Sequence, residues 1–190
     1  MAKPMTTRGL ARERVLEAAL TLFSEHGVHG TSLKMIADHV GVGKAAVYYQ
    51  FHSKDEIALE VVRPALDDMA RVVRIAKALP DWDARRAVTV SGLVEMAVRH
   101  RRLAALLHSD PAIEHLITNV PDLKSVADQL RELLEGPERQ ARSRIASLVF
   151  LAGIGSAAAN ADLVDVDDAD LHAALFDLGN KILQPVAEDV

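Results

Sequence analysis

The sequence predicts an all-α protein of about nine helices. Almost every segment repeats its apolar residues at helical spacing, and no stretch has the pattern of a strand. Aromatic residues make up only 4% of the chain, and Ala, Leu and Val dominate the apolar set, a mixture that favours helix over strand. With 49% hydrophobic residues among 190, the chain can form a packed core.

The first four predicted helices have recognisable ends. The first covers about residues 7–26 and precedes Gly27, and the second covers about 31–40 and precedes Gly41. Glycine adopts the left-handed conformation that ends many helices. A third helix is predicted over about 44–51.

A fourth helix begins after a capping box made by Ser53 and Glu56. Its apolar pattern continues to about Leu79. Pro64 lies inside this helix and is expected to kink it, because proline removes a helical hydrogen bond.

Five more helices are predicted after the break at residues 80–82. Asp110-Pro111 is typical of an N-cap followed by the first residue of a helix, and Gly136-Pro137 is typical of a helix end. The predicted ranges are about 83–100, 101–108, 111–134, 139–161 and 167–183.

The composition limits the cellular compartment and the kinds of chemical site that are expected. The sequence contains no cysteine, which excludes disulfides and thiolate metal sites. No apolar run has the length of a membrane span, and the first five residues lack the apolar stretch of a signal peptide. We therefore expect a cytoplasmic protein with no membrane partner, and the sequence indicates no cofactor and no metal site.

The charge is unevenly distributed along the chain. The protein carries a formal charge of −5, but residues 1–54 hold seven Lys or Arg and only four Asp or Glu. The first part is therefore at +3 and the remainder at −8. A basic N-terminal segment followed by an acidic remainder is expected of a protein that binds phosphates with one end only.

Three short helices within the first 52 residues, joined by turns that contain glycine, predict a helix-turn-helix unit. Small Ala37 lets the second and third helices approach, and Gly41 makes the turn between them. Val42, Val47 and Phe51 are expected in the core, where they hold the third helix in place.

The opposite face of the third helix is expected to face solvent. It carries Lys44, Ala45, Tyr48 and Tyr49. Two exposed tyrosines beside a lysine are unusual on a surface unless something binds there. Since the major groove of double-stranded DNA accepts one helix, and these side chains can reach phosphates and base edges, DNA is the predicted partner.

The N-terminal sequence resembles the signature of the TetR family over about residues 10–60. The resemblance rests on Thr31–Ala37, Gly41-Val42, Val47–Phe51 and Ser53–Ile57. It implies a regulator, usually a repressor, that binds a palindromic operator as a homodimer and responds to a small-molecule effector. It also implies a DNA-binding domain over 1–54 and a variable helical ligand-binding and dimerisation domain over 55–190.

The resemblance further implies roles for individual residues. Gly43 and Gln50 depart from the family pattern, in which Ser or Thr and His or an aromatic residue are common, and both bear on the operator sequence. Two alternatives stay open, because Tyr48 can be a packing residue and Lys54 an ordinary solvated lysine. A cation at a helix start opposes the helix dipole, which favours the phosphate role for Lys54. The implied base-reading residues are Lys44, Ala45 and Tyr49, and the implied phosphate contacts are Thr31, Tyr48 and Lys54.

Two features of the last two helices indicate a dimer interface. The penultimate helix is rich in small residues, which permit close helix approach, and the last helix has an apolar row spaced by four, three and four. An ordinary core within one chain is the alternative. The candidate interface residues are Ala152, Gly155, Ala159, Leu171, Leu175, Leu178 and Ile182.

An effector pocket is expected among apolar residues of the helices that surround the centre of the second domain, and an apolar lining favours an apolar effector. Two other functions are alternatives: a DNA-binding dimer without an effector, and a helical enzyme with a vestigial DNA-binding head. The sequence contains no pattern of paired carboxylates, metal ligands or an activated nucleophile that would support the enzyme. The candidate lining residues are Met69, Val72, Trp82, Leu93, Met96, Leu103, Leu107, Leu116 and Phe150.

Overall fold

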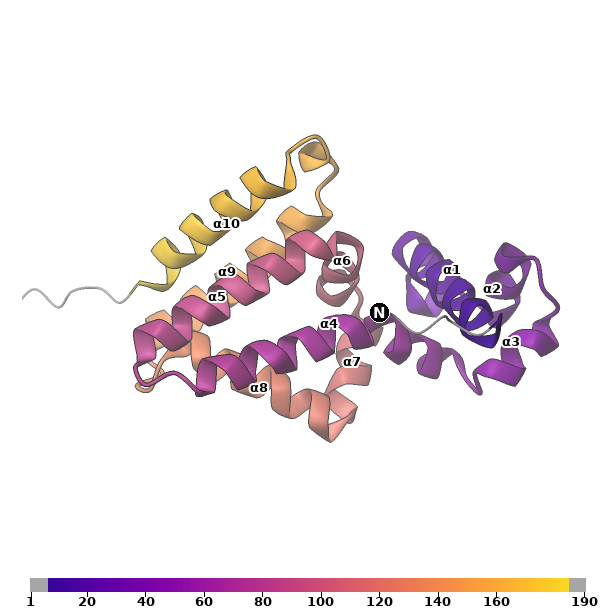
Figure 1. Cartoon of the computed structure of the whole chain (residues 1–190), viewed down its shortest axis with the longest axis horizontal. Coiled ribbons are helices and arrows are strands. Elements are labelled where there is room, and N and C mark those ends of the chain that lie inside the picture. Colours follow the sequence, from indigo (N-terminus) through magenta and orange to yellow (C-terminus); the bar gives the residue numbers. More distant parts are fainter. Residues whose placement is uncertain (1–6, 185–190) are drawn as a thin grey trace, which may run out of the picture.

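The computed structural model describes residues 7–184, and this part of the chain is helical with no strand. Residues 1–6 and 185–190 lie outside it, including the five to which the expectation about a signal peptide refers. Figure 1 shows an elongated molecule with α1, α2 and α3 at one end. Helix α4 passes from this unit into the second one, which contains the remaining helices.

The N-terminal unit consists of α1 (Thr7–Gly30), α2 (Leu33–Val40) and α3 (Lys44–Gln50). Helix α1 continues past its predicted end, but Gly27 inside it has non-helical angles, φ 71° and ψ 165°. A residue with a side chain is strained at such a positive φ, so glycine allows the kink. The predicted break is therefore present, and one more turn of helix follows it.

Helix α4 (Lys54–Lys77) begins at the predicted capping box. The Ser53 hydroxyl accepts a hydrogen bond from Glu56 N at 3.0 Å, and the Glu56 carboxylate accepts one from His52 N at 2.7 Å. These bonds satisfy backbone donors that have no partner inside the helix. Pro64 lies within α4, and the helix continues through it.

The second part contains six α-helices and a short 3₁₀ turn. Its predicted helix over 111–134 is wrong, because two helices occupy that range. Val120 is extended, with φ −101° and ψ 109°, and Pro121 begins the next helix. Proline disfavours the helical conformation of the residue before it. The elements are α5 (Trp82–Arg99), α6 (Arg101–Ser109), α7 (Pro111–Asn119), α8 (Pro121–Glu135), α9 (Ala141–Ala159), the 3₁₀ turn η1 (Ala161–Leu163) and α10 (Asp168–Leu183).

One hydrophobic core runs through both parts of the molecule. Helix α4 packs against α1, α5 and α8, while α10 packs against α5 and α9. Gly179 of α10 permits this last approach, since a Cβ there would lie 2.5 Å from Cε2 of Phe150. Phe150, predicted to line the pocket, is instead 2% exposed and packed beneath α10.

Part of the predicted dimer interface belongs to the core of a single chain. Leu171 and Leu175 are 4% and 9% exposed, because α10 turns this side toward its own α5 and α9. Leu178 and Ile182, in contrast, are 53% and 37% exposed. The apolar row of α10 is thus divided between the core and the surface.

Helix α9 is apolar on both sides. Phe150 and Ile154 are buried on its inner side. Ile145, Leu148 and Val149 are exposed on another side of the same helix, at 52–61%. Such a face suits a partner, because a monomer gains nothing from three large exposed apolar side chains at helical spacing.

We expect Leu175→Ala to lower the free energy of unfolding by about 2–5 kcal/mol, because it leaves a cavity in a packed core. The loss should not depend on protein concentration, since Leu175 packs within its own chain. Urea denaturation at two protein concentrations measures both points. Leu178→Ala is the matched control on the same helix, and an equal loss for this exposed residue at the lower concentration would contradict the assignment.

Candidate nucleic-acid interface

Helices α2 and α3 form a helix-turn-helix whose geometry follows from a few residues. Ser32 caps α2, its hydroxyl accepting a hydrogen bond from Met35 N at 3.2 Å. Gly41 ends α2 in the left-handed conformation at φ 78°, and its N–H and that of Val42 both reach Ala37 O at 3.0 Å. Ala37 is 1% exposed, so the predicted small residue lies where the helices meet.

Helix α3 packs against the core with one side and is exposed to solvent on the other. Val47 and Phe51 are fully buried, as predicted. Val42 is not, since 37% of it is exposed; it lies in the turn, where its backbone rather than its side chain completes the C-cap of α2. The prediction that Val42 is a core residue is therefore wrong.

The outward face of α3 carries the four predicted residues. Lys44 and Ala45 are exposed, as are Tyr48 at 46% and Tyr49 at 73%. The Lys44 ammonium lies 5.3 Å from the centroid of the Tyr48 ring, within range of a cation–π interaction. A cation, a small residue and two phenol groups thus share one helix face at the end of the molecule.

The other two predicted contacts, Thr31 and Lys54, have partners inside the protein. Thr31 is 2% exposed, and its hydroxyl is within hydrogen-bond distance of Leu22 O and Gly27 O. Its side chain cannot reach a phosphate in this conformation, which corrects that assignment. Lys54 is half-buried, and its Nζ donates to Thr31 O at 3.0 Å and His29 O at 3.4 Å.

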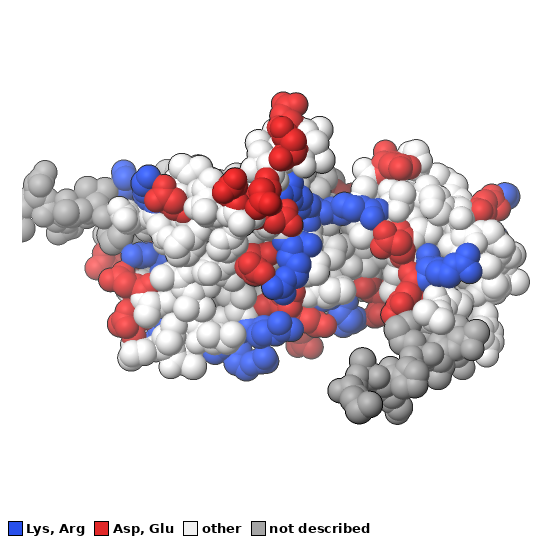
Figure 2. All heavy atoms as spheres, turned by 45° about the horizontal axis from the view of Figure 1, so that its top comes forward, with Lys and Arg blue, Asp and Glu red and all other residues white. Residues whose placement is uncertain are grey.

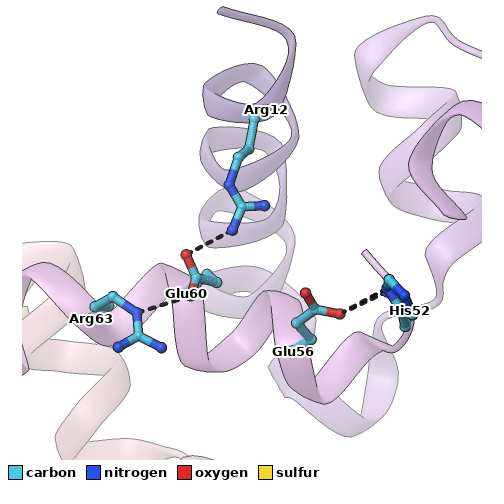
Figure 3. Close-up of polar contacts among 5 residues, drawn as sticks. All are labelled: Arg12, His52, Glu56, Glu60 and Arg63. Carbon is cyan, nitrogen blue, oxygen red and sulfur yellow. Dashed lines mark hydrogen bonds and ion pairs between the residues drawn. The ribbon is translucent and has the colours of Figure 1, made fainter. Parts of the chain in front are cut away.

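Arg12 joins α1 to the end of α3 and to α4, a role that the sequence did not indicate. Figure 3 shows its guanidinium directed at Glu60, with Nη2 2.8 Å from Oε2. The same guanidinium lies 4.3 Å from the centroid of the Phe51 ring. Arg63 donates to the other carboxylate oxygen of Glu60 at 2.8 Å.

Two opposing effects set the pKa of Glu60. Partial burial raises the pKa, but the hydrogen bonds and positive charges of Arg63 and Arg12 outweigh it. The pKa of Glu60 therefore lies below its usual value, and the carboxylate, in its ionised form, joins α1 to α4.

An apolar pocket of about 310 Å³ lies between α4, α5, α6 and α9. It brings together four of the nine predicted lining residues, namely Met69, Leu93, Met96 and Leu107. It also contains seven residues that were not predicted to line a pocket, two of which, Ala152 and Gly155, were predicted at the dimer interface. The seven are Ala97, Ala104, Leu148, Leu151, Ala152, Ile154 and Gly155.

The remaining predicted lining residues lie elsewhere. Val72 packs against Gly92, and Leu116 packs half-buried against the core. Leu103 faces a groove between α1, α4 and α6, while Trp82 lines a pocket at the far end of the second part. A helical period identifies buried positions, but it does not say which of them border a cavity.

The described residues were predicted to hold no metal and to cross no membrane. Within residues 7–184, no group of three or more His, Asp or Glu side chains is placed to hold a metal ion. None of the helices described there combines the length and the apolar character that crossing a membrane requires.

The geometry defines a helix-turn-helix protein with an exposed recognition-type helix and a second, helical part that contains a pocket. Residues 15–61 match the family of bacterial regulatory proteins described as the tetR family. The resemblance to the TetR family is thereby confirmed: the chain carries the N-terminal domain of that family and is related to its transcriptional regulators.

Curated relatives match part of the chain. The HTH-type transcriptional repressor KstR2 of Rhodococcus jostii (strain RHA1) is 29% identical over 129 residues, which are 66% of this chain and 62% of that protein. The biofilm operon regulator IcaR of Staphylococcus aureus (strain Newman) is 28% identical over 102 residues, or 53% and 55% of the two chains. The matches thus span less than two thirds of these relatives.

Solved structures show the same fold over almost the whole chain. The ketosteroid transcriptional regulator KstR2 of Mycobacterium tuberculosis has a TM-score of 0.68 at 17% identity, covering 96% of each chain. A TetR-family regulator from Bordetella parapertussis 12822 has a TM-score of 0.67 at 17% identity, covering 89% of this chain and 93% of the other.

We expect Glu60→Gln to lower stability at neutral pH and to flatten its loss in acid. A carboxylate whose folded pKa is depressed contributes stability above its unfolded pKa of about 4.3, and this contribution is lost as the pH falls through the lower folded pKa. Urea unfolding between about pH 7 and pH 3 measures the difference. Arg12→Gln should reproduce part of the effect, and an unchanged acid profile of Glu60→Gln would contradict this role.

Proposed function

We propose that the protein is a transcriptional repressor of the TetR type, which binds a palindromic operator as a homodimer and releases it when a small apolar molecule enters its second domain. The observation that carries the DNA-binding part is the outward face of α3, where Lys44, Ala45, Tyr48 and Tyr49 are exposed together. The repressor assignment is supported by the KstR2 and IcaR relatives.

Within this proposal, α3 enters the major groove. Lys44 and Tyr49 meet base edges and Ala45 allows close approach, while Tyr48 reaches a phosphate. Lys54 donates two hydrogen bonds to backbone carbonyls and can offer a third N–H to a phosphate. The natural boundary between the DNA-binding and effector domains falls at about residue 54, where α4 begins.

The proposed dimer face is the exposed apolar side of α9 and α10. We define it as Ile145, Leu148, Val149, Leu178 and Ile182. Two such faces related by a two-fold axis form a four-helix interface, and the symmetry implies two inverted operator half-sites. Ala152 and Ala159 are exposed on α9 and belong to the same proposal, whereas Gly155 is buried beside the pocket.

The proposed effector site is the apolar pocket between α4, α5, α6 and α9. Its volume of about 310 Å³ and its lining of Leu, Ile, Met, Ala and Gly suit a small apolar molecule. This pocket favours effector control over the alternative of a DNA-binding dimer without an effector. Operator release by apolar compounds, followed by fluorescence anisotropy of labelled DNA, distinguishes the two.

An operator obtained by selection from random DNA allows base contacts to be separated from phosphate contacts. Lys44→Ala should flatten the preference at particular base pairs, by about 1–3 kcal/mol for each lost contact. Lys54→Ala should weaken binding to all sequences alike and reduce the salt slope by about one unit per half-site. Anisotropy titrations over a salt series, with cognate and singly changed operators, measure both effects.

Lys124→Ala, an exposed lysine of α8, is the matched control and should leave DNA binding unchanged. If Lys54→Ala changes the base preference and Lys44→Ala does not, the two roles are reversed. If neither substitution affects binding, α3 is not the reading helix.

We expect Val149→Glu to dissociate the dimer and to abolish tight operator binding, because it places a charge in each copy of a symmetric apolar interface. Analytical ultracentrifugation measures the mass, and anisotropy measures the affinity. Ile75→Glu replaces an exposed apolar residue of α4 outside the dimer face and should remain dimeric. A dimeric Val149→Glu with normal affinity would show that the interface lies elsewhere.

A further inference from the structure

The carboxylate of Asp110 makes two hydrogen bonds that join distant parts of the chain. Oδ1 accepts from Ala112 N at 2.9 Å and thereby caps α7, as the sequence predicted. Oδ2 accepts from Val28 N at 2.7 Å, which lies in α1 just after the kink at Gly27. One side chain of the effector domain thus holds the backbone of the DNA-binding unit.

The donor at Val28 needs such a partner. The helical geometry of α1 is interrupted at Gly27, and Val28 is only 2% exposed, so little water is at hand for its N–H. A buried backbone donor without a partner is destabilising. The carboxylate also lies against Gly27, where a Cβ would be in ordinary van der Waals contact with Oδ2 of Asp110, at 3.5 Å.

The segment that Asp110 holds is the one that positions α2. Thr31 closes it through its hydroxyl, whose single proton lies within hydrogen-bond distance of Gly27 O and Leu22 O. Lys54 at the start of α4 donates to His29 O and Thr31 O. Ser32, the N-cap of α2, follows directly. A displacement of Val28 therefore acts on the start of α2 and, through the tight turn after it, on α3.

Asp110 also stands at the end of a helix that borders the effector pocket. Its N–H donates to Leu106 O at 3.2 Å and closes α6, which contributes Ala104 and Leu107 to the pocket lining. Near the start of α6, Arg102 donates to Glu17 Oε1 at 2.7 Å and to the Thr21 hydroxyl at 2.8 Å, both on α1.

Helix α6 is therefore bonded to α1 near both of its ends. On the face shown in Figure 2, basic and acidic side chains gather where the two parts of the molecule meet. Arg102 is exposed in this contact, so its ion pair contributes less than the hydrogen bond of Asp110 to a buried residue.

We propose that Asp110 is the positioning residue that couples the filling of the pocket to the orientation of the helix-turn-helix. A molecule that displaces α6 moves Asp110, and the hydrogen bond to Val28 carries this displacement to α2 and α3. The proposal rests on the proposed function, because it assigns the connection between the effector site and the DNA-binding face.

The capping role and the coupling role of Asp110 can be separated by substitution. Serine is a good N-cap, so Asp110→Ser retains an acceptor for Ala112 N. Its single, shorter hydroxyl cannot also reach Val28. Asp167→Ser is the matched control, because Asp167 caps α10 through the same bond to the second following N–H, Ala169 N at 2.7 Å.

The pocket can be filled without an identified effector. Ala104→Phe places a ring in it from α6, and Ala97→Phe does so from α5, which provides a second variant if the first does not fold. Each is combined with Asp110→Ser and with Asp167→Ser, and affinity for an operator selected by the wild-type protein is measured by anisotropy. Thermal unfolding confirms that each variant is folded.

We expect the filled pocket to weaken operator binding by roughly tenfold in the wild-type and Asp167→Ser backgrounds, a typical size for coupling between sites. In the Asp110→Ser background the same substitution should weaken it by less than about threefold, since the connection is already broken. Hydrogen exchange of the Val28 amide should also be faster in Asp110→Ser, by about tenfold, and unchanged in Asp167→Ser.

Equal weakening in all three backgrounds would overturn the coupling role, and so would an unchanged affinity of both filled variants in the wild-type background. Either result leaves operator binding itself intact. Failure of the proposed function gives a different result, because selection from random DNA then yields no operator for the wild-type protein.

Discussion

The helical geometry of α1 is interrupted at Gly27, and the N-terminal end of the molecule depends on the hydrogen bonds that hold residues 27–31 at and after this kink. Partners for residues 27–31 come from three places: Thr31 itself, Lys54 at the start of α4, and Asp110 at the start of α7. Each bond satisfies a backbone group near the core, where water is scarce. The position of α2 consequently depends on elements far away in the sequence.

Helix α4 connects the two parts of the molecule and packs against helices of both. Its first turns hold the capping box and Glu60, which binds Arg12 of α1, and its later turns pack against α5 and α8. Arg12 also covers Phe51 at the end of α3, so a single guanidinium of α1 contacts both α4 and the C-cap of α3. A rotation of α4 would therefore move the whole helix-turn-helix. This connection exists in addition to the contacts that α6 makes with α1.

Helix α9 contributes to the core, to the pocket and to an exposed apolar face. Its inner side packs in the core, one flank borders the pocket through Leu151 and Gly155, and its outer side is apolar and exposed. Leu148 belongs to both the pocket lining and the proposed dimer face. The small residues of α9, which suggested close packing between two copies, serve in part to leave space for the pocket within one copy.

The sequence by itself determined the features that depend on neighbours along the chain. Helical periods, the caps at Ser53 and Asp110, the turn at Gly41 and the outward face of Lys44 and Tyr49 all follow from spacings of a few residues. Only the tertiary structure decided which apolar face meets which partner. Leu175 lies in the core because α5 and α9 cover that side of α10, and Phe150 lies under Gly179 instead of lining a pocket.

The same distinction applies to polar residues, because a side chain bonds to whatever the fold brings near it. Thr31 has the residue type and position of a phosphate contact, yet its hydroxyl is buried against carbonyl groups of α1. The hydrogen bond from Val28 N to Asp110 joins residues 82 positions apart, and no local sequence pattern predicts it. Spacing along the chain determines the elements, whereas contacts between distant elements determine what their side chains can do.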